Sequence, residues 1–233
     1  MSEGPPVLYL DLDGTLLDIR EKYHRLHRRI AADLGRQALT WDTFWARKRR
    51  GGTLDDLLPD WEETARREYA KRWLGEIELP LYTRFDRLVP GARHSLVRLG
   101  REFELVLITL RRDGRELRRQ LRHLGLDQLF SHLLVSGDHG GANLTKAQLL
   151  SLAVPPEKRK SIVVGDTEED VLAARAMRAP VIAVLTGMRD RAFLAALSPD
   201  LIIESVAQLP AALQSALPSP AAGGRSSLKA GLP

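Results

Sequence analysis

The chain has 233 residues and a formal net charge of +5, with 44% of its residues hydrophobic and 28% charged. This composition is typical of a soluble globular protein that is long enough to bury a core and to carry one smaller module besides. The sequence contains no cysteine, which excludes disulfide bonds, zinc sites with thiolate ligands and cysteine nucleophiles.

The first predicted element is a strand over residues 7–10 (VLYL), which runs directly into Asp11 and Asp13. Side chains at positions i and i+2 of a strand point the same way, so both carboxylates should project from one edge of a sheet. Gly14 follows and allows the chain to turn sharply. A buried strand that ends in two acidic residues indicates a functional site.

Residues 17–88 depart from this pattern, since they contain no convincing strand. Their apolar spacing instead predicts helices over 21–35, 42–50 and 61–78. All four tryptophans of the chain lie here, namely Trp41, Trp45, Trp61 and Trp73. We therefore predict a small helical domain inserted after the first strand, with the tryptophans in an aromatic core of its own.

Two groups of residues in this insertion allow a functional alternative. Residues 47–50 form a basic run followed by Gly51 and Gly52. We expect a solvated helix end with a glycine stop, and the alternative is contact with the anionic or leaving-group part of a substrate. His24 and His27 share one helix face, where we expect surface positions, with contact to substrate as the alternative.

Beyond the insertion, apolar segments alternate with helical patterns. The predicted strands cover residues 103–109, 132–136, 161–165, 180–186 and 201–205, and the predicted helices cover 91–102, 114–125, 145–153 and 168–178. Strands rich in Val, Ile and Leu without strict alternation are typical of a parallel sheet buried on both faces. The sequence therefore predicts an α/β fold: a Rossmann-like parallel sheet core with helices on both faces, plus the inserted α-helical domain.

These elements divide the chain into three parts. Residues 1–16 and 89–216 are predicted to form the α/β catalytic core, and residues 17–88 the inserted helical domain. Residues 217–233 are small, polar and rich in proline and glycine, which predicts a disordered tail.

The sequence lacks the basic start and apolar segment of a secretory signal, and no apolar run is long enough to cross a bilayer. We therefore expect a cytoplasmic protein that does not contact a membrane. Much of the positive charge is arginine on amphipathic patterns such as residues 111–125, where we expect a solvated helix face, with attraction for anionic substrates as the alternative. Nucleic-acid binding is not expected, because no binding motif accompanies the charge.

Polar residues follow several of the predicted strands. Asp11 follows the first strand, Thr109 ends the second, and Asp166 follows the fourth. Ligands of open parallel sheets bind at the carboxyl ends of the strands, so these residues converge if their strands are neighbours. Lys146 opens a helix between the third and fourth strands. Its ammonium and the Thr109 hydroxyl supply the charge and the donor that a phosphate needs.

Asp11, Asp13, Asp166 and Asp170 would place three or four carboxylates in one crevice. Such a cluster is unstable unless a cation or protons neutralise it. Oxygen ligands alone favour Mg²⁺ over zinc or copper. An aspartate beside Mg²⁺ can attack phosphorus to form an aspartyl-phosphate, and a second carboxyl can protonate the leaving oxygen and then deprotonate the attacking water.

Four segments together resemble the signature motifs of the haloacid dehalogenase-like hydrolase superfamily. In chain order they are DLDGT at residues 11–15, Thr109 after the apolar run LVLI, Lys146, and GDTEED at residues 165–170. Their order and spacing agree over about residues 7–210, and the first and fourth motifs are specific together. A helical insertion between the first and second motifs is similar to the cap of the phosphoglycolate-phosphatase-like branch.

The resemblance implies roles for the acidic residues. Asp11 would be the nucleophile and a Mg²⁺ ligand. Asp13 would be the general acid and base and would give the metal its backbone carbonyl. Asp166 would complete the metal site, and Asp170 would bind the metal directly or through water.

The resemblance also implies which residues bind the substrate. Thr109 and Lys146 would hold the phosphate, and Lys146 would also steady Asp11. Thr15, which would brace the loop, and Leu110 complete the predicted substrate-binding residues.

The sequence departs from the family pattern at two places. Ala147 follows Lys146, where proline is usual, and Thr109 is followed by Leu-Arg-Arg instead of a small polar residue. We expect Arg111 to begin a basic helix, with a position near the site as the alternative. Lys160 is a second candidate for the phosphate-binding lysine, but it directly precedes the fourth strand of the sheet and is expected at the opposite edge.

The activity implied by the resemblance is a Mg²⁺-dependent phosphatase for a small phosphomonoester, such as a phosphoglycolate-like compound, a sugar phosphate or a nucleotide. Its partner would be that small phosphorylated metabolite, and the chain would be a monomer or homodimer. Asp13 favours this chemistry, because dehalogenases and phosphonatases of the superfamily lack the second aspartate. The alternatives are a phosphotransferase such as a sugar-phosphate mutase, and a non-catalytic binding protein that kept the fold.

Overall fold

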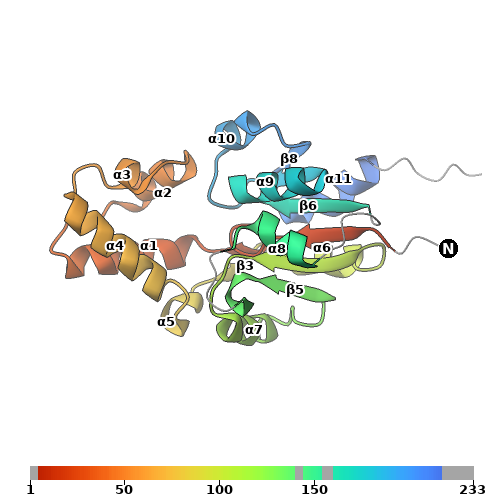
Figure 1. The fold of residues 1–233 in the computed structure, drawn as a ribbon, viewed down its shortest axis with the longest axis horizontal. Coiled ribbons are helices and arrows are strands. Elements are labelled where there is room, and N and C mark those ends of the chain that lie inside the picture. Colours follow the sequence, from red (N-terminus) through yellow and green to blue (C-terminus); the bar gives the residue numbers. More distant parts are fainter. Residues whose placement is uncertain (1–4, 140–143, 154–159, 217–233) are drawn as a thin grey trace, which may run out of the picture.

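The structure, a computed structural model, describes residues 5–139, 144–153 and 160–216. At its centre is a six-stranded sheet in the order β5-β4-β1-β6-β7-β8, in which every neighbouring pair is parallel (Figure 1). The strands are β1 (Val7–Leu10), β4 (Glu104–Thr109), β5 (His132–Val135), β6 (Ser161–Gly165), β7 (Val181–Val184) and β8 (Leu201–Ile203). All six predicted strands are confirmed, and so is the predicted α/β class.

The two faces of the sheet are buried by two separate sets of helices. Because side chains alternate along a strand, Leu8 and Leu10 of β1 enter one buried cluster and Val7 and Tyr9 the other. The first cluster includes residues of α6 (Ala92–Leu99), α7 (Gly114–His123) and α11 (Leu209–Ala216). The second includes residues of α8 (Lys146–Ala153) and α9 (Glu168–Met177). The prediction of helices on both faces is therefore confirmed.

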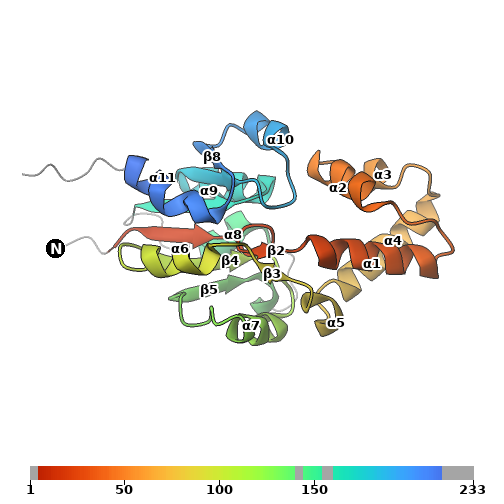
Figure 2. The ribbon, with the colours of Figure 1, turned by 180° about the vertical axis from the view of Figure 1, so that it is seen from behind.

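Five helices form a second group beside the carboxyl ends of the strands, which we call the helical region (Figures 1 and 2). They are α1 (Arg20–Asp33), α2 (Trp41–Arg49), α3 (Leu54–Leu57), α4 (Glu63–Glu76) and α5 (Pro80–Thr83). The α2 helix begins after Thr40, whose hydroxyl accepts a hydrogen bond from the amide of Thr43 at 3.3 Å. Thr53 and Asp56 form a capping box at the start of α3. These polar residues fix where α2 and α3 begin.

The helical region has its own hydrophobic cluster, which shares no buried residue with the two clusters of the sheet. Trp45 and Trp61 are buried in it and Trp73 packs against it, as predicted. The prediction is wrong for Trp41, which is 41% exposed. Trp41 is the first residue of α2 and lies at the rim of the cluster.

His27 also differs from its prediction, since it is buried and not at the surface. Its Nε2 accepts a hydrogen bond from the amide of Leu39 at 2.8 Å, and its Nδ1 lies 3.1 Å from the hydroxyl of Tyr69. The imidazole stacks on Phe44. Burial and the nearby His24 lower the pKa of His27 to about 4.

The chain passes between the sheet and the helical region at two short strands, β2 (Leu17–Asp18) and β3 (Arg87–Leu88). They pair with each other in antiparallel fashion (Figure 2). Strands of two residues have no periodicity that a sequence could reveal. The ladder lies at the predicted limits of the inserted domain, at residues 17 and 88, and the predicted tail over residues 217–233 lies outside the described residues.

Within the described parts of the chain, we find no helix that combines the length and the apolar character needed to span a membrane.

Candidate active site

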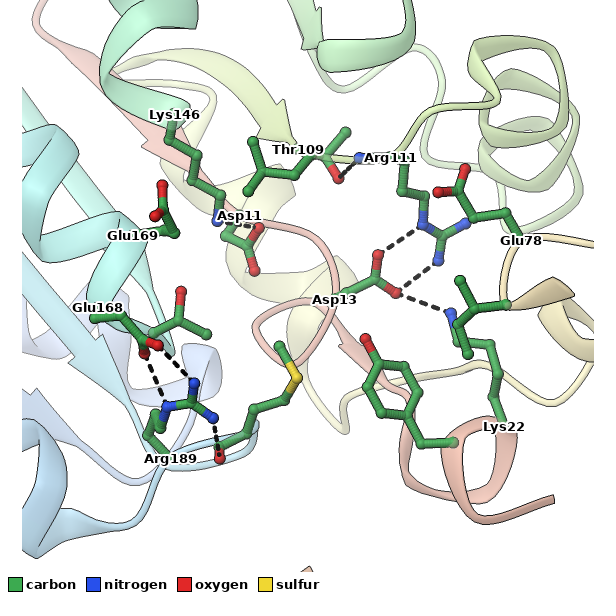
Figure 3. A pocket seen from close by; sticks show the side chains of 15 residues that line it. Asp11, Asp13, Lys22, Glu78, Thr109, Arg111, Lys146, Glu168, Glu169 and Arg189 are labelled. Atoms are coloured by element: carbon green, nitrogen blue, oxygen red, sulfur yellow. Dashed lines mark hydrogen bonds and ion pairs between the residues drawn. The ribbon is translucent and has the colours of Figure 1, made fainter. Parts of the chain in front are cut away.

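A pocket of about 300 Å³ lies between the helical region and the carboxyl ends of β1 and β4 (Figure 3). Five of the predicted residues line it: Asp11, Asp13, Thr109 and Leu110 at the ends of β1 and β4, and Lys146 at the start of α8. The helical region contributes Lys22 and Tyr23 from α1, and Ile77 and Glu78 from the segment between α4 and α5. Because β1 pairs with both β4 and β6, the ends of all three strands meet here. The structure thus brings the predicted strand-end residues together.

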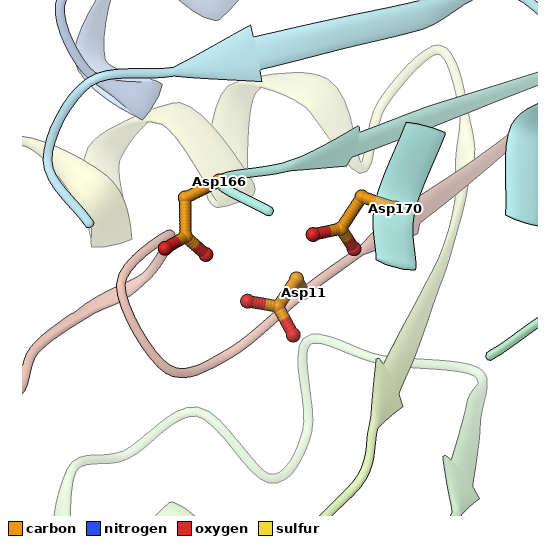
Figure 4. A group of neighbouring side chains, drawn as sticks. All are labelled: Asp11, Asp166 and Asp170. Carbon is orange, nitrogen blue, oxygen red and sulfur yellow. The ribbon is translucent and has the colours of Figure 1, made fainter. Parts of the chain in front are cut away.

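Three carboxylates gather at one side of this pocket (Figure 4). Oxygen atoms of Asp11, Asp166 and Asp170 lie within 4.8 Å of one another, and all three residues are buried. The side chain of Asp13 is not part of this triad and points toward Arg111 and Lys22. Carboxylate oxygens are the donors that Mg²⁺ prefers, so the triad fits a hard divalent cation.

Two glycines leave room for the carboxylate of Asp166. A Cβ atom at Gly14, whose φ is +96°, or at Gly187 would overlap this carboxylate. The amide of Met188 donates a hydrogen bond of 2.6 Å to Asp166 Oδ2. Burial, with Asp11 and Asp170 nearby, raises the pKa of Asp166 well above its usual range. The backbone is thus shaped around a carboxylate that stays costly to ionise until a cation is near.

Asp11 is held by a lysine and a threonine. Lys146 Nζ lies 2.5 Å from Asp11 Oδ1 and 2.6 Å from Asp170 Oδ1, and Thr15 Oγ1 donates to Asp11 Oδ2 at 3.2 Å. Burial raises the pKa of Asp11 to about 6, although Lys146 acts in the opposite direction. The two carboxylates raise the pKa of Lys146, so its ammonium stays charged. The single positive charge of Lys146 does not balance the negative charge that the three carboxylates of the triad carry when ionised.

Asp13 is held by a different pair of cations. Arg111 Nε donates to Asp13 Oδ2 at 2.6 Å and Nη2 donates to Oδ1 at 2.7 Å, which is a bidentate pair. Lys22 Nζ, from the first turns of α1, lies 3.1 Å from Asp13 Oδ1. Although burial opposes it, the charges of Arg111 and Lys22 lower the pKa of Asp13. Asp13 is therefore an ionised carboxylate in this arrangement.

The same cations continue into a buried network around Asp86, which precedes β3. Asp86 Oδ2 accepts from Lys22 Nζ at 3.0 Å, from Arg111 Nη2 at 3.0 Å and from Gln120 Nε2 at 2.9 Å. Burial raises the pKa of Asp86, against the pull of Lys22 and Arg111. The network joins Asp13 to both segments that lead into the helical region.

The remaining predicted residues lie as follows. Thr109 is buried at the end of β4, and its hydroxyl accepts from the amide of Arg111 at 3.3 Å. Leu110 is 37% exposed in the pocket wall. Lys160 precedes β6, and its carbonyl accepts from the amide of Val7 at the start of β1. Lys160 therefore lies at the opposite edge of the sheet, and Lys146 is the lysine of the pocket.

The basic run at the end of α2 contacts the sheet side of the molecule. Arg49 Nη2 donates to the carbonyl of Leu185 at 2.8 Å, and the amide of Asp190 donates to the carbonyl of Arg49 at 2.8 Å. In return, Arg189 Nη1 donates to the carbonyl of Lys48 at 3.2 Å. We call these reciprocal contacts the arginine clasp. The expected solvated helix end is wrong for Arg49, while the glycine stop is confirmed, because Gly51 has a φ of +66°.

Sequence reasoning missed Lys22 and Asp86, and it gave the position of Arg111 near the site only as the alternative. Arg111 does not begin a helix as expected, since α7 begins at Gly114 and Arg111 turns into the pocket (Figure 3). The available signal was its position two residues after Thr109, which places both on one side of an extended chain. Lys22 and Asp86 carry no local signal, because their partners are distant in the sequence.

Comparison with known proteins gives consistent relatives. A family model described as haloacid dehalogenase-like hydrolase matches residues 8–184. The chain is 31% identical over 226 residues to a plasmid-encoded phosphoglycolate phosphatase of Cupriavidus necator, covering 91% of this chain and 95% of the relative. It is 29% identical over 214 residues to a phosphoglycolate phosphatase of Synechococcus elongatus, covering 87% of this chain and 94% of the relative.

Solved structures show the same fold. A haloacid dehalogenase-like hydrolase family protein of Streptococcus pneumoniae superposes with a TM-score of 0.71 at 21% identity, covering 90% of this chain and 99% of that chain. A Thermotoga maritima protein described as a beta-phosphoglucomutase superposes with a TM-score of 0.62 at 23% identity, covering 91% of this chain and all of that chain.

Proposed function

The chain belongs to the haloacid dehalogenase-like hydrolase family, and on that premise we propose that it is a Mg²⁺-dependent phosphatase for a small phosphomonoester of the phosphoglycolate type. The observation that carries the proposal is the buried triad of Asp11, Asp166 and Asp170, with Lys146 bonded to two of its members. The helical region, which covers the pocket, would be the cap. Its predicted limits at residues 17 and 88 are part of this proposal.

The triad would hold the metal. The carboxylates of Asp11, Asp166 and Asp170 would be ligands, and the backbone carbonyl of Asp13 is a further candidate. When bound, Mg²⁺ would neutralise the carboxylates and draw charge from the phosphate. Thr15 Oγ1 lies 3.2 Å from an oxygen of Asp11 and 3.2 Å from an oxygen of Asp166, so its hydroxyl bridges these two side chains with the one proton it can donate.

Asp11 would be the nucleophile. One of its carboxylate oxygens would form a bond to phosphorus while the bond from phosphorus to the ester oxygen breaks, which yields an aspartyl-phosphate. Lys146 orients Asp11 through its 2.5 Å contact and adds positive charge where the phosphate would lie. Thr109 offers a hydroxyl from the neighbouring strand end, and Leu110 forms the wall beside it.

Asp13 would move the protons. The leaving oxygen takes a proton from the Asp13 carboxyl, and water that attacks the aspartyl-phosphate later gives a proton back, which restores Asp11 and frees phosphate. The ion pairs with Arg111 and Lys22 hold Asp13 ionised, the form that accepts a proton from water. For the first step, the carboxyl has to leave this pair. Lys22 belongs to the helical region, so a movement of that region would help release it.

The size of the pocket and the relatives both favour a small substrate. About 300 Å³ is at the lower end of the volumes that ligand pockets usually have. Both curated relatives act on phosphoglycolate according to their names, and each aligns over most of this chain. We therefore place 2-phosphoglycolate first among the candidate substrates.

The test is phosphate release from a panel of small phosphomonoesters, with and without Mg²⁺. We expect metal-dependent release, with 2-phosphoglycolate among the best esters. Asp11→Asn should lower kcat by about three orders of magnitude or more, as losses of nucleophiles do. Asp127→Asn is the matched control, because Asp127 is exposed, and it should turn over like the native chain.

Other outcomes would contradict the proposal in distinct ways. An isomerised sugar phosphate without free phosphate would identify a phosphotransferase of the same chemistry. Full activity of Asp11→Asn would exclude the aspartyl-phosphate route. Absence of turnover on every ester would leave a binding protein that kept the fold.

A further inference from the structure

Lys48, in the last turn of α2, places an ammonium group against aromatic rings of the helical region. Its Nζ lies 5.7 Å from the ring centroid of Trp73 and 6.0 Å from that of Tyr23. Tyr23 itself lines the pocket, as do Glu168 and Arg189 on the opposite side. The backbone of Lys48 is fixed by the bond from Arg189 to its carbonyl. The ammonium therefore lies against two aromatic rings of the helical region. Of these, Tyr23 lines the pocket, whereas Lys48 itself is not among the residues that line it.

This ammonium differs from the cations that line the pocket. Lys22, Arg111, Lys146 and Arg189 each form an ion pair with a carboxylate. Within residues 5–139, 144–153 and 160–216, no carboxylate lies within ion-pair distance of Lys48 Nζ and no hydrogen bond to it occurs. Burial and the nearby charge of Arg189 lower the pKa of Lys48 to about 8, although Glu168 acts in the opposite direction. An ammonium in this environment gains stability when an anion arrives.

The ring of Tyr23, whose centroid lies 6.0 Å from Lys48 Nζ, carries a further hydrogen-bond donor. The hydroxyl of Tyr23 makes no hydrogen bond to any residue that the structure describes, although the side chain is largely covered. Burial and, after it, the charge of Asp13 raise the pKa of Tyr23 against the effect of Arg111, so the hydroxyl keeps its proton and can donate. The ring of Tyr23 is held between Trp45 and Trp73, at centroid distances of 6.1 and 5.1 Å. Both free donors thus belong to the helical region and are fixed by aromatic packing.

We propose that Lys48 and Tyr23 bind the carboxylate at the non-reacting end of the substrate. One ammonium and one hydroxyl donor match an anion of a single charge with two acceptor oxygens. The phosphate would lie at the other end of the pocket, beside Asp11 and Lys146. The proposal rests on the phosphatase function above and narrows its substrate class to short phosphomonoesters that carry a carboxylate.

The test compares two esters with the same two-carbon skeleton, 2-phosphoglycolate and 2-hydroxyethyl phosphate, which lacks the carboxylate. Lys48→Met keeps the aliphatic stem over Trp73 and Tyr23 but removes the charge. We expect it to raise KM for 2-phosphoglycolate about 10- to 100-fold, the usual loss for a hydrogen bond to a charged group, and to leave KM for 2-hydroxyethyl phosphate unchanged. Lys48→Arg should recover most of the loss, and Tyr23→Phe should give a smaller change of the same kind.

The matched control is Lys71→Met, which removes one positive charge from the exposed face of α4. This variant should leave KM unchanged for both esters. Calorimetric titration of both esters into Asp11→Asn, with and without Lys48→Met, measures binding apart from turnover and should show the same selective loss.

The outcomes separate this proposal from the function on which it rests. Turnover by the native chain with equal losses for both esters in Lys48→Met, or with no loss, would overturn the carboxylate site and leave the phosphatase intact. Selective binding of the carboxylate ester without turnover by the native chain would overturn the phosphatase and support the site.

Discussion

The carboxylate of Asp13 is bound by two cations that come from different parts of the chain. Arg111 lies just after β4, and Lys22 lies in α1 of the helical region. Both also bind Asp86, which lies just before β3. A residue proposed to move protons in the pocket is thus tied directly to the segments that join the pocket to the helical region.

His27 makes the stability of the helical region depend on pH. Its Nε2 accepts the amide proton of Leu39, so the neutral ring carries its proton on Nδ1 and donates to Tyr69. A second proton on Nε2 would face that amide and break the bond. The folded pKa of about 4 lies below the unfolded value of 6.5. Between pH 6.5 and 4 the unfolded chain therefore binds a proton that the folded chain does not, and stability falls as the pH falls.

We expect the free energy of unfolding to fall by about 3 kcal/mol between pH 7 and pH 4 because of His27 alone, given 1.36 kcal/mol per pKa unit. Urea denaturation across this range, followed by tryptophan fluorescence, measures it. His27→Gln should flatten the pH dependence, while His123→Gln, at an exposed position, should not. Equal pH slopes for all three proteins would contradict the assignment.

Much of the candidate site can be predicted from the sequence, because the carboxyl ends of neighbouring parallel strands lie at the same edge of a sheet. Asp11, Thr109 and Asp166 end or follow β1, β4 and β6, which are neighbours in the sheet. Lys22 and Asp86 could not be found this way. They pair across 64 residues, and only the packing of the helical region on the sheet brings them together.

The arginine clasp connects α2 to the loop between β7 and α10 (Arg191–Ala196). Each side donates from an arginine to a carbonyl of the other side: Arg49 to that of Leu185, and Arg189 to that of Lys48. Gly51 packs so closely on Phe193 that a Cβ atom would overlap the ring. The helical region is therefore in close contact with the sheet side at a second place, away from β2 and β3.

We expect Arg49→Met to loosen this contact. The amide of Asp190, which donates to the carbonyl of Arg49 at 2.8 Å, should exchange its hydrogen about tenfold faster, corresponding to about 1.4 kcal/mol of lost local stability. Hydrogen–deuterium exchange resolves this segment.

Arg50→Met is the control for the clasp. Arg50 is the next residue along the chain, is exposed, and makes no side-chain hydrogen bond among the described residues. Its variant should exchange like the native chain. If both variants speed exchange alike, the loss of charge and not the clasp is responsible.

At the level of elements, the sequence predicts strands and long helices but not short ones. The six strands of the sheet have apolar runs that identify them, and α1 has a clear helical period, whereas α2 and α4 are only weakly amphipathic. The short helices α3, α5 and α10 were not predicted, since four to six residues are too few for a period. The β2–β3 ladder was not predicted either, because tertiary contacts and not a local sequence pattern define it.

For the molecule as a whole, the triad predicts that metal binding and folding are coupled. Three buried carboxylates face one ammonium, so the ionised form of all three is unfavourable until a cation such as Mg²⁺ binds. At a Mg²⁺ concentration about 100 times Kd, the free energy of unfolding should rise by about 2.7 kcal/mol. Thermal or urea denaturation with Mg²⁺ or chelator measures this without any substrate.

Asp166→Asn should lose most of the stabilisation by Mg²⁺, because it removes one charged ligand. Sodium chloride at the same ionic strength should not reproduce the effect in the native chain. Equal stabilisation of native and variant chains by Mg²⁺ would place the metal elsewhere.

The two-residue β2–β3 ladder has a consequence for how such chains diversify. Because the chain leaves and re-enters the sheet side at paired neighbours, the intervening segment begins and ends at one point in space. A different segment with the same short joint could be inserted there without altering the strand order or the triad. Recombination at this joint would exchange the residues above the pocket while inheriting the triad and Lys146. A foreign segment grafted between Asp18 and Arg87 would also have to replace Lys22 and Asp86, which belong to the network around Asp13.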